Sequence, residues 1–238
     1  RDYPGWDDTD FGRFKEWMLK VWYHGVIGFL QGRNGTQDDH YWSNWGLCNV
    51  LCAMSSVSCA TMSSSTTKLR SIISIWKTTV MANRCIIWSG NFIRTNAALS
   101  AISADAGIQP RPRACRHALA LAADLCGTGR NQGDDFYALK DDRIVCGFEY
   151  VNAYNSGVDD LPNSPYTNCD GTFMRMGDGG RGTNRPAQAR IVNYYENIRG
   201  IEVPYSRKML EMNENGIEQE ADSAEGTAAD TTIWVSVP

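Results

Sequence analysis

The sequence predicts an all-α fold built from helical hairpins. Apolar and aromatic residues recur at three- and four-residue spacing over several long segments, and no segment sustains the alternation typical of a strand. Clusters of Gly, Asn, Asp and Pro separate these segments. The chain has 238 residues, of which 42% are hydrophobic and 21% charged, so it is long enough to bury a core.

The first two predicted helices lie at residues 11–31 and 39–58. Acidic residues at 7–10 offer an N-terminal cap, and glycines at 32 and 35 end the first helix. In the second helix His40 and Asn44 are four residues apart and share a face, beside several aromatic side chains. Polar groups next to aromatic rings suit a sugar-binding cleft, because sugar rings stack on aromatic faces. An aromatic-rich core helix with an exposed start fits the same residues.

The periodic pattern is lost between residues 55 and 130. Runs of Ser and Thr alternate there with single cysteines, and only an Ala/Leu run at 118–125 predicts a short helix. The Pro-Arg-Pro-Arg segment ending at Arg113 is expected to resist helix and sheet alike. We therefore treat residues 55–130 as an atypical segment within a single domain that covers residues 1–217.

Helical spacing returns at residues 144–154, between Pro186 and Gly200, and again at 204–212. Residues 155–184 are rich in Gly, Asn, Asp and Pro and predict a long irregular loop, a kind of segment that often carries function. The end of the chain, residues 218–238, is acidic and rich in small residues, which predicts a mobile tail.

Composition excludes several classes of function. The net charge is -4, and the sequence has no long basic run and no zinc-type Cys/His spacing, so we expect no nucleic-acid partner and no metal. No apolar run reaches the roughly 18 residues of a membrane span, so we expect no membrane partner. Eight cysteines fit an oxidising compartment with their pairing open, Asn34-Gly35-Thr36 is a glycosylation acceptor pattern, and the chain starts without Met. We therefore expect secretion.

One run resembles a motif of a known family. His40-Tyr41-Trp42-Ser43-Asn44-Trp45-Gly46-Leu47-Cys48-Asn49 is similar to the His-Tyr-Trp-Ala-Asn-Trp-Asp-Leu-Cys-Asn motif of the alginate-lyase superfamily, which comprises secreted polyuronate lyases. Further matching segments occur in the same order and are Phe14-Lys15-Glu16-Trp17-Met18, Asn131-Gln132-Gly133-Asp134-Asp135-Phe136-Tyr137, Glu149-Tyr150-Val151, Tyr154-Asn155, Gly180-Arg181-Gly182, Arg185-Pro186, Tyr194-Tyr195 and Val203-Pro204-Tyr205. The resemblance covers roughly residues 10–54 and 131–210.

The resemblance implies an (α/α) toroid, here incomplete, and β-elimination of a uronic-acid polymer such as alginate or glucuronan. That reaction needs donors for the carboxylate, a base for the C-5 proton and an acid for the leaving oxygen. The resemblance assigns the carboxylate to His40 and Asn44, and proton transfer to a tyrosine, with Tyr194 preferred over Tyr150 and Tyr154. Substrate contacts fall on Tyr41, Trp42, Trp45, Arg181 and Arg185. We expect a monomer that binds an acidic polysaccharide without a cofactor.

The sequence also departs from the family. A second family signature, roughly Gly-Arg-Asp-Gln-x-His, supplies another Arg and His, and Gln109-Pro110-Arg111-Pro112-Arg113-Ala114-Cys115 stands in its place. Codons permitted for these residues, and for residues 71–83, can spell family-like text in other frames, so we hypothesise that residues 55–130 are an out-of-frame or mis-spliced translation. Arg113 and His117 are the residues that can replace the missing pair. Three functions stay open: an active lyase, a non-catalytic carbohydrate-binding toroid, and an inactive product of a damaged reading frame.

Overall fold

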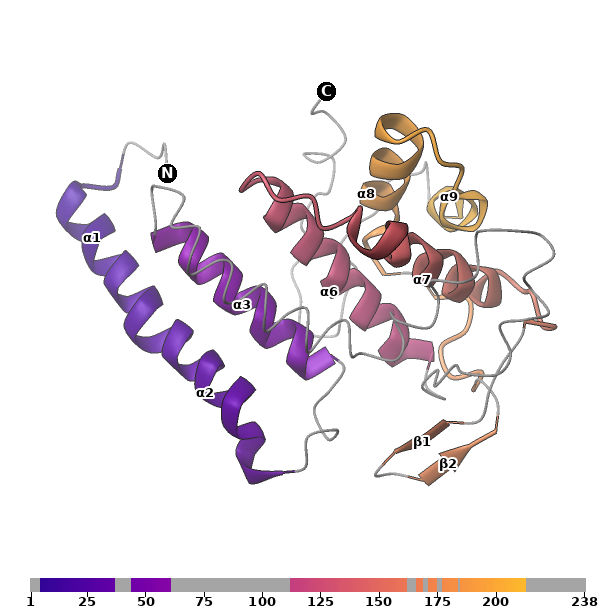
Figure 1. Cartoon of the computed structure of the whole chain (residues 1–238), viewed down its shortest axis with the longest axis horizontal. Coiled ribbons are helices and arrows are strands. Elements are labelled where there is room, and N and C mark those ends of the chain that lie inside the picture. Colours follow the sequence, from indigo (N-terminus) through magenta and orange to yellow (C-terminus); the bar gives the residue numbers. More distant parts are fainter. Residues whose placement is uncertain are drawn as a thin grey trace. The chain divides into compact units, whose positions relative to one another are not determined.

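The computed structural model describes residues 5–36, 44–60, 112–161, 166–168, 171–174, 177–183 and 185–212 (Figure 1). Within these residues the chain is mainly helical, which confirms the helical character predicted from the sequence. Contacts between Cα atoms divide the chain into two compact units, Arg1–Val80 and Met81–Pro238, and each is described here by itself. The single domain over residues 1–217 and the toroidal arrangement stay predictions, and the predicted tail at 218–238 lies outside the described residues.

The N-terminal unit contains two long helical segments that pack against each other. The first consists of α1 (Asp8–Trp17), the π-helical η1 (Met18–Tyr23), α2 (His24–Gly32) and the 3-10 turn η2 (Arg33–Gly35), close to the predicted range. The second is α3 (Asn44–Ala60), which contacts η1 and α2. The carboxylate of Asp7 caps α1 by accepting the Asp10 N–H at 2.8 Å. The buried side of α3 has the expected helical spacing and consists of Leu47, Val50, Ala53, Met54 and Val57.

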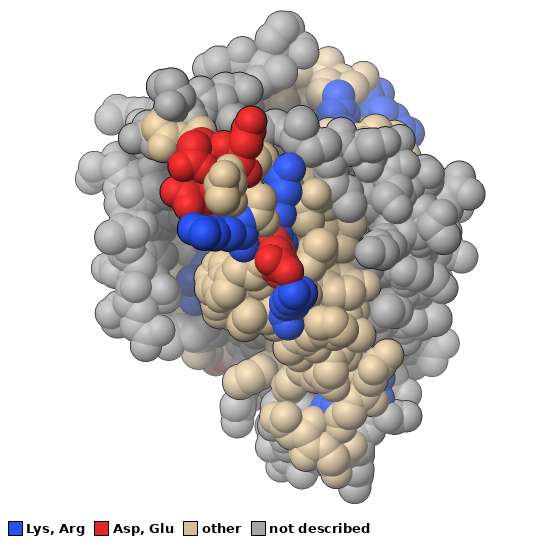
Figure 2. Space-filling model, turned by 90° about the vertical axis from the view of Figure 1, so that its left-hand side faces the viewer, with Lys and Arg blue, Asp and Glu red and all other residues tan. Residues whose placement is uncertain are grey.

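The first helical segment carries charged residues near its start and none over most of its second part. Figure 2 looks at the side where α1 and α2 lie in Figure 1, and its red and blue atoms gather toward one end of this face. The sequence explains this distribution, since Asp, Glu, Lys and Arg occur up to Lys20 and none follows until Arg33. Trp17 and Trp22 are each 46% exposed on this segment. No helix among the residues placed by the structure is long and apolar enough to cross a membrane.

The second unit contains the helices α6 (Pro112–Arg130), α7 (Leu139–Asn155), α8 (Gln188–Val192), η6 (Asn193–Ile198) and α9 (Pro204–Glu211). Helix α6 contacts α7, and both α7 and α8 contact α9. The strands β1 (Tyr166–Asn168) and β2 (Gly171–Phe173) pair antiparallel, with Tyr166 opposite Phe173. This hairpin corrects the prediction of an irregular loop without strands at 155–184. Strands of three residues are too short to show an alternating pattern in the sequence.

Helix α6 corrects two further predictions. It begins at Pro112, although the segment up to Arg113 was expected to resist helix, because proline is tolerated in the first turn, where its missing N–H has no helical partner. It also covers the last quarter of the atypical segment, residues 112–130, and its core side is fully buried at Ala118, Ala122 and Leu125. Since α3 extends to Ala60, the remainder of that segment is residues 61–111, which the structure does not describe.

A close approach near the end of α6 predicts a difference between two glycines of the same helix. A Cβ on Gly129 would lie 2.4 Å from two ring carbons of buried Phe136, whereas a Cβ on Gly127 would meet only the Tyr137 hydroxyl at 3.8 Å. We expect Gly129→Ala to lower the free energy of unfolding by about 1–3 kcal/mol. Gly127→Ala should leave it unchanged or raise it by up to about 1 kcal/mol through helix propensity. Urea unfolding of both variants measures this, and equal stabilities would contradict it.

A buried carboxylate joins α7 to the start of α9. Glu149 is 3% exposed, and its two oxygens accept the backbone N–H groups of Tyr205 at 2.9 Å and Ser206 at 2.8 Å. The first N–H groups of a helix have no acceptor within the helix, and the Glu149 carboxylate supplies acceptors for two of them at the start of α9. Beside it, the Asn152 amide donates to the side chains of Gln188 at 2.8 Å and Ser206 at 3.0 Å. The network therefore fixes α7, α8 and α9 to one another.

Glu149 gives the stability of this unit a specific pH dependence. Burial raises the pKa of Glu149, and the hydrogen bonds from Ser206 and Tyr205 offset this only in part. A carboxyl with a higher pKa in the folded state contributes stability below its unfolded pKa and loses it as the pH rises through the folded pKa. We therefore expect the wild type to lose stability relative to Glu149→Gln as the pH rises through and above the ordinary glutamate range. Urea unfolding over a pH series measures this, with the exposed Glu202→Gln as control, and parallel curves would contradict it.

Candidate functional site

The predicted site residues of the N-terminal unit are only partly described. His40, Tyr41 and Trp42 lie outside the described residues, whereas Asn44 and Trp45 begin α3. Trp45 is 61% exposed, and its ring stacks on that of Phe29 with centroids 5.9 Å apart. The position of Trp45 is compatible with a sugar platform, and the roles of these five residues stay predictions.

The second unit brings three predicted site residues to one end, where α6 begins and α7 ends. Tyr150 is close enough to Cys115 of α6 and to Tyr154 for both to influence its ionisation. Arg185 is likewise close to His117 of α6. Arg181 contacts Tyr154 directly. Tyr154 connects Arg181 with Tyr150 in one cluster. His117 and Arg185 belong to the same end of the unit, because Arg116, which precedes His117, donates to Asn155, which follows Tyr154.

The turn that carries Arg181 makes most of the contacts within this cluster. The Tyr154 hydroxyl donates to Asp178 Oδ1 at 2.7 Å, and the Arg181 guanidinium lies 4.2 Å from the centre of the Tyr154 ring. Arg181 also donates to the Tyr154 carbonyl at 2.8 Å and pairs with Asp159 at 2.6 Å. Burial and the hydrogen bond to Asp178 raise the pKa of Tyr154, so its phenol stays protonated at neutral pH. Tyr154 can therefore act as a proton donor.

His117 and Arg185 combine a neutral imidazole with a cation. His117 is half-buried, and burial is the first cause that lowers its pKa, followed by the charge of Arg185. An imidazole with a lowered pKa is neutral at pH 7 and can accept a proton. A guanidinium binds carboxylates through its planar set of donors. The pair therefore has the two groups that proton abstraction beside a carboxylate requires.

Tyr150 differs from Tyr154 in its accessibility. Tyr150 is 1% exposed, and burial is the main cause that raises the pKa of its phenol. A phenol in this position packs in the core beneath the cluster, whereas Tyr154 lies at its edge with 8% of its surface exposed. Of the two tyrosines at this end, Tyr154 is the better placed to exchange a proton with a bound molecule.

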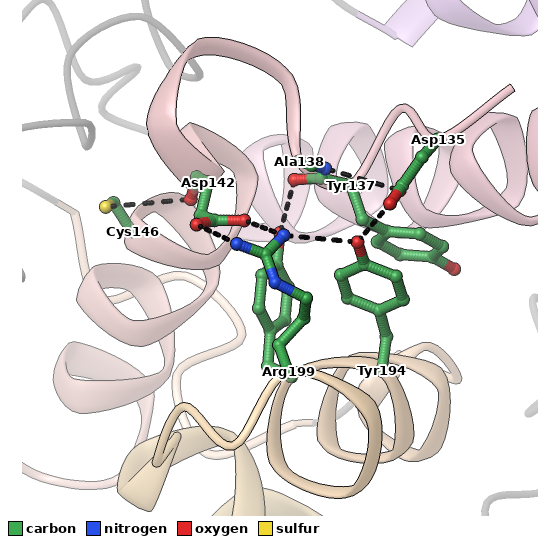
Figure 3. Close-up of polar contacts among 8 residues, drawn as sticks. Asp135, Tyr137, Ala138, Asp142, Cys146, Tyr194 and Arg199 are labelled. Carbon is green, nitrogen blue, oxygen red and sulfur yellow. Dashed lines mark hydrogen bonds and ion pairs between the residues drawn. The ribbon is translucent and has the colours of Figure 1, made fainter.

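Tyr194 belongs to a second cluster (Figure 3). Its hydroxyl donates to Asp135 Oδ2 at 2.5 Å and accepts from Arg199 at 3.3 Å. Arg199 in turn pairs with both oxygens of Asp142 at 2.9 and 3.1 Å. The Tyr194 ring stacks on Tyr137 with centroids 4.3 Å apart. Burial and then the bond to Asp135 raise the pKa of Tyr194, while Arg199 opposes the shift.

The two clusters lie at opposite ends of α6. The guanidinium of Arg130, the last residue of α6, lies 5.2 Å from the centre of the Tyr194 ring, whereas His117 belongs to the opposite half of the helix. At about 1.5 Å rise per residue, His117 and Arg130 are about 20 Å apart along the axis. The structure therefore does not bring Tyr194 together with Arg181 and Arg185. The sequence contained one signal that favoured the tyrosines of α7 over Tyr194. Tyr150 and Tyr154 are four residues apart and therefore lie on one side of that helix.

The described residues contain no group of three or more His, Cys, Asp or Glu side chains placed to hold a metal ion. Six cysteines in the described ranges are free thiols: Cys48, Cys52, Cys59, Cys115, Cys126 and Cys146. Comparison of the chain with protein-family models, curated proteins and solved structures found no match. The resemblance to the alginate-lyase superfamily accordingly stays a prediction from the motifs.

Proposed function

We propose that the chain is a polysaccharide lyase that cleaves a uronic-acid polymer, such as alginate or glucuronan, by β-elimination. The feature that supports it best is His117, a half-buried histidine whose pKa is lowered by burial and by the charge of Arg185. The same end of the unit holds Tyr154 and Arg181, which belong to motifs that resemble those of polyuronate lyases. The proposal includes secretion and a monomeric state.

The proposed reaction breaks the C5–H and C4–O bonds of the polymer and forms the C4–C5 double bond and the O–H bond of the released sugar. Arg185 binds the uronate carboxylate and stabilises the negative charge that develops on it. His117 removes the C-5 proton, the C4–O bond breaks, and the electron pair of the C–H bond forms the C4–C5 double bond. Tyr154 donates a proton to the leaving glycosidic oxygen. The proton taken by His117 returns to the Tyr154 oxygen through solvent, so no water is added to the product.

The sequence-based assignments complete this proposal. Arg181 lies beside the donor Tyr154 and would hold the charge of a neighbouring uronate. His40 and Asn44 remain proposed carboxylate donors of the N-terminal unit. Tyr150 would support Tyr154 from the core. A second candidate function is carbohydrate binding without turnover, favoured by the exposed Trp45 ring.

The experiment is to incubate the protein with polymannuronate, polyguluronate or glucuronan and to follow the ultraviolet absorbance of the new double bond. We expect a rise with at least one of these polymers and none with the same polymer after its carboxylates are reduced to alcohols. The absence of a rise with every uronan would contradict the lyase proposal. Binding by calorimetry without any rise would favour the second candidate.

The two tyrosine clusters predict opposite results for two matched substitutions. We expect Tyr154→Phe to lower turnover roughly 100-fold or more, because it removes the proton donor and keeps the ring that contacts Arg181. Tyr194→Phe removes the hydrogen bond to Asp135 in the cluster beside Arg130, which lies about 20 Å from His117 along α6, and should leave turnover within a few-fold of wild type. Initial rates of both variants measure this. The reverse order would place the reaction at the Asp135 cluster.

A further inference from the structure

A buried polar network joins the turn that precedes Arg185 to both long helices of the unit. Arg116 of α6 and Asn155 of α7 are each 4% exposed, and Arg116 Nη1 donates to Asn155 Oδ1 at 2.7 Å. The same Asn155 oxygen accepts the Gly182 N–H at 2.8 Å, and the Asn155 amide donates to the Thr183 carbonyl at 2.7 Å. One side chain therefore binds the backbone of the turn at two successive residues.

The second arm of Arg116 reaches the same turn. Arg116 Nη2 donates to the Thr183 hydroxyl at 2.8 Å, and this hydroxyl donates to the Gly180 carbonyl at 2.7 Å. Gly180 and Gly182 have φ values of 74° and 81°, in the left-handed region that favours glycine. The tight turn thus presents the Thr183 hydroxyl to Arg116 and the Thr183 carbonyl to Asn155. The bond from the charged Arg116 contributes roughly a factor of ten or more to holding the turn.

The network joins the two chain segments that carry the groups of the proposed reaction. His117 directly follows Arg116 in α6, and Arg185 comes two residues after Thr183. The bond between Arg116 and Thr183 therefore joins the segment that carries the base to the segment that carries the cation. A displacement of the turn would move Arg185 and leave His117 in place on its helix.

We propose that Arg116, Asn155 and Thr183 form a clamp that holds the turn before Arg185 to the start of α6, which carries His117, and that they act as positioning residues for the bound carboxylate. This inference rests on the proposed function, because it assigns the clamp to the same site. The clamp does not touch the substrate. It acts through Arg185, whose guanidinium needs a fixed distance from the imidazole if one uronate is to contact both.

The test compares Thr183→Val, which removes the hydroxyl, with Thr183→Ser, which retains it, in the full chain. The first readout is the nuclear magnetic resonance titration of His117, with the two other histidines of the chain as internal references. We expect Thr183→Val to raise the pKa of His117 toward the ordinary histidine value, because Arg185 is released, and Thr183→Ser to restore the wild-type titration. The second readout is the KM for the cleaved uronan, which should rise about tenfold in Thr183→Val and return in Thr183→Ser.

Thr172→Val, at an exposed threonine of β2 outside this network, is the matched control and should change neither readout. Asn155→Ala should raise the pKa of His117 as Thr183→Val does, and by more. If Asn155→Ala does not fold, because Asn155 is buried, Thr183→Val alone decides. An unchanged His117 titration in Thr183→Val would overturn the clamp. If the wild type cleaves no uronan, the proposed function fails, and the titration still decides whether the clamp holds the turn before Arg185 to the start of α6.

Discussion

Replacement of His117 by Gln is expected to lower the rate of uronan cleavage roughly 10²- to 10⁴-fold, the usual contribution of a general base. Gln keeps a polar side chain of similar size but cannot take a proton. Because burial and Arg185 lower the pKa of His117, the wild-type rate should rise with pH below the ordinary histidine range and be constant at neutral pH. This acid limb should be absent from the residual activity of His117→Gln.

The control for this prediction is His24→Gln, at an exposed histidine of α2. It should retain the wild-type rate and the wild-type pH profile. Initial rates over a pH series, with circular dichroism to show that both variants are folded, measure the effect. A His117→Gln variant that is folded and fully active would remove His117 from the reaction and leave the Tyr194 cluster as the alternative.

Glu149→Ala should cause a large loss of stability in this unit. It leaves the N–H groups of Tyr205 and Ser206 at the start of α9 without their acceptor, and a buried donor without a partner costs about 1–3 kcal/mol. We expect the free energy of unfolding to fall by about 2–6 kcal/mol at neutral pH, less the relief from removing a buried charge. Urea unfolding measures this loss.

Glu202→Ala provides the comparison for Glu149→Ala. Glu202 is exposed and lies two residues before α9, so its removal should change the free energy of unfolding by less than about 0.5 kcal/mol. The two variants differ in the burial of the carboxylate and in its bonds to the helix start. Similar stabilities of the two would show that the Glu149 carboxylate does not hold α9.

The helices were predictable where one side is buried and the periodic signal is long. In α3 the buried residues from Leu47 to Val57 repeat every three or four positions, and this repeat is visible in the sequence. Helix α6 was predicted too short. Its first turn contains Pro112, and its helical conformation depends on packing against α7. The hairpin of β1 and β2 was missed because three-residue strands have no measurable period.

The site was predictable only in its residue types. The motifs indicated that a tyrosine and two arginines belong together, but they did not show which tyrosine. Arg181 and Tyr154 meet through a turn that returns to the end of α7, and no local spacing encodes that return. The charge of Arg185 on His117 is likewise a long-range effect. Tyr194, preferred from its motif, lies instead with Asp135 and Arg199.

The most direct test of β-elimination is the mass of the cleaved fragments. Elimination breaks the C4–O bond without adding water, so the fragment with the new non-reducing end should contain an unsaturated uronate and be lighter by one water than the corresponding hydrolysis fragment. Wild-type protein with the polymer that gives the ultraviolet signal should yield this result, and His117→Gln should yield far less product. Fragments that are all saturated, each with the mass of a hydrolysis product, would contradict the proposed reaction.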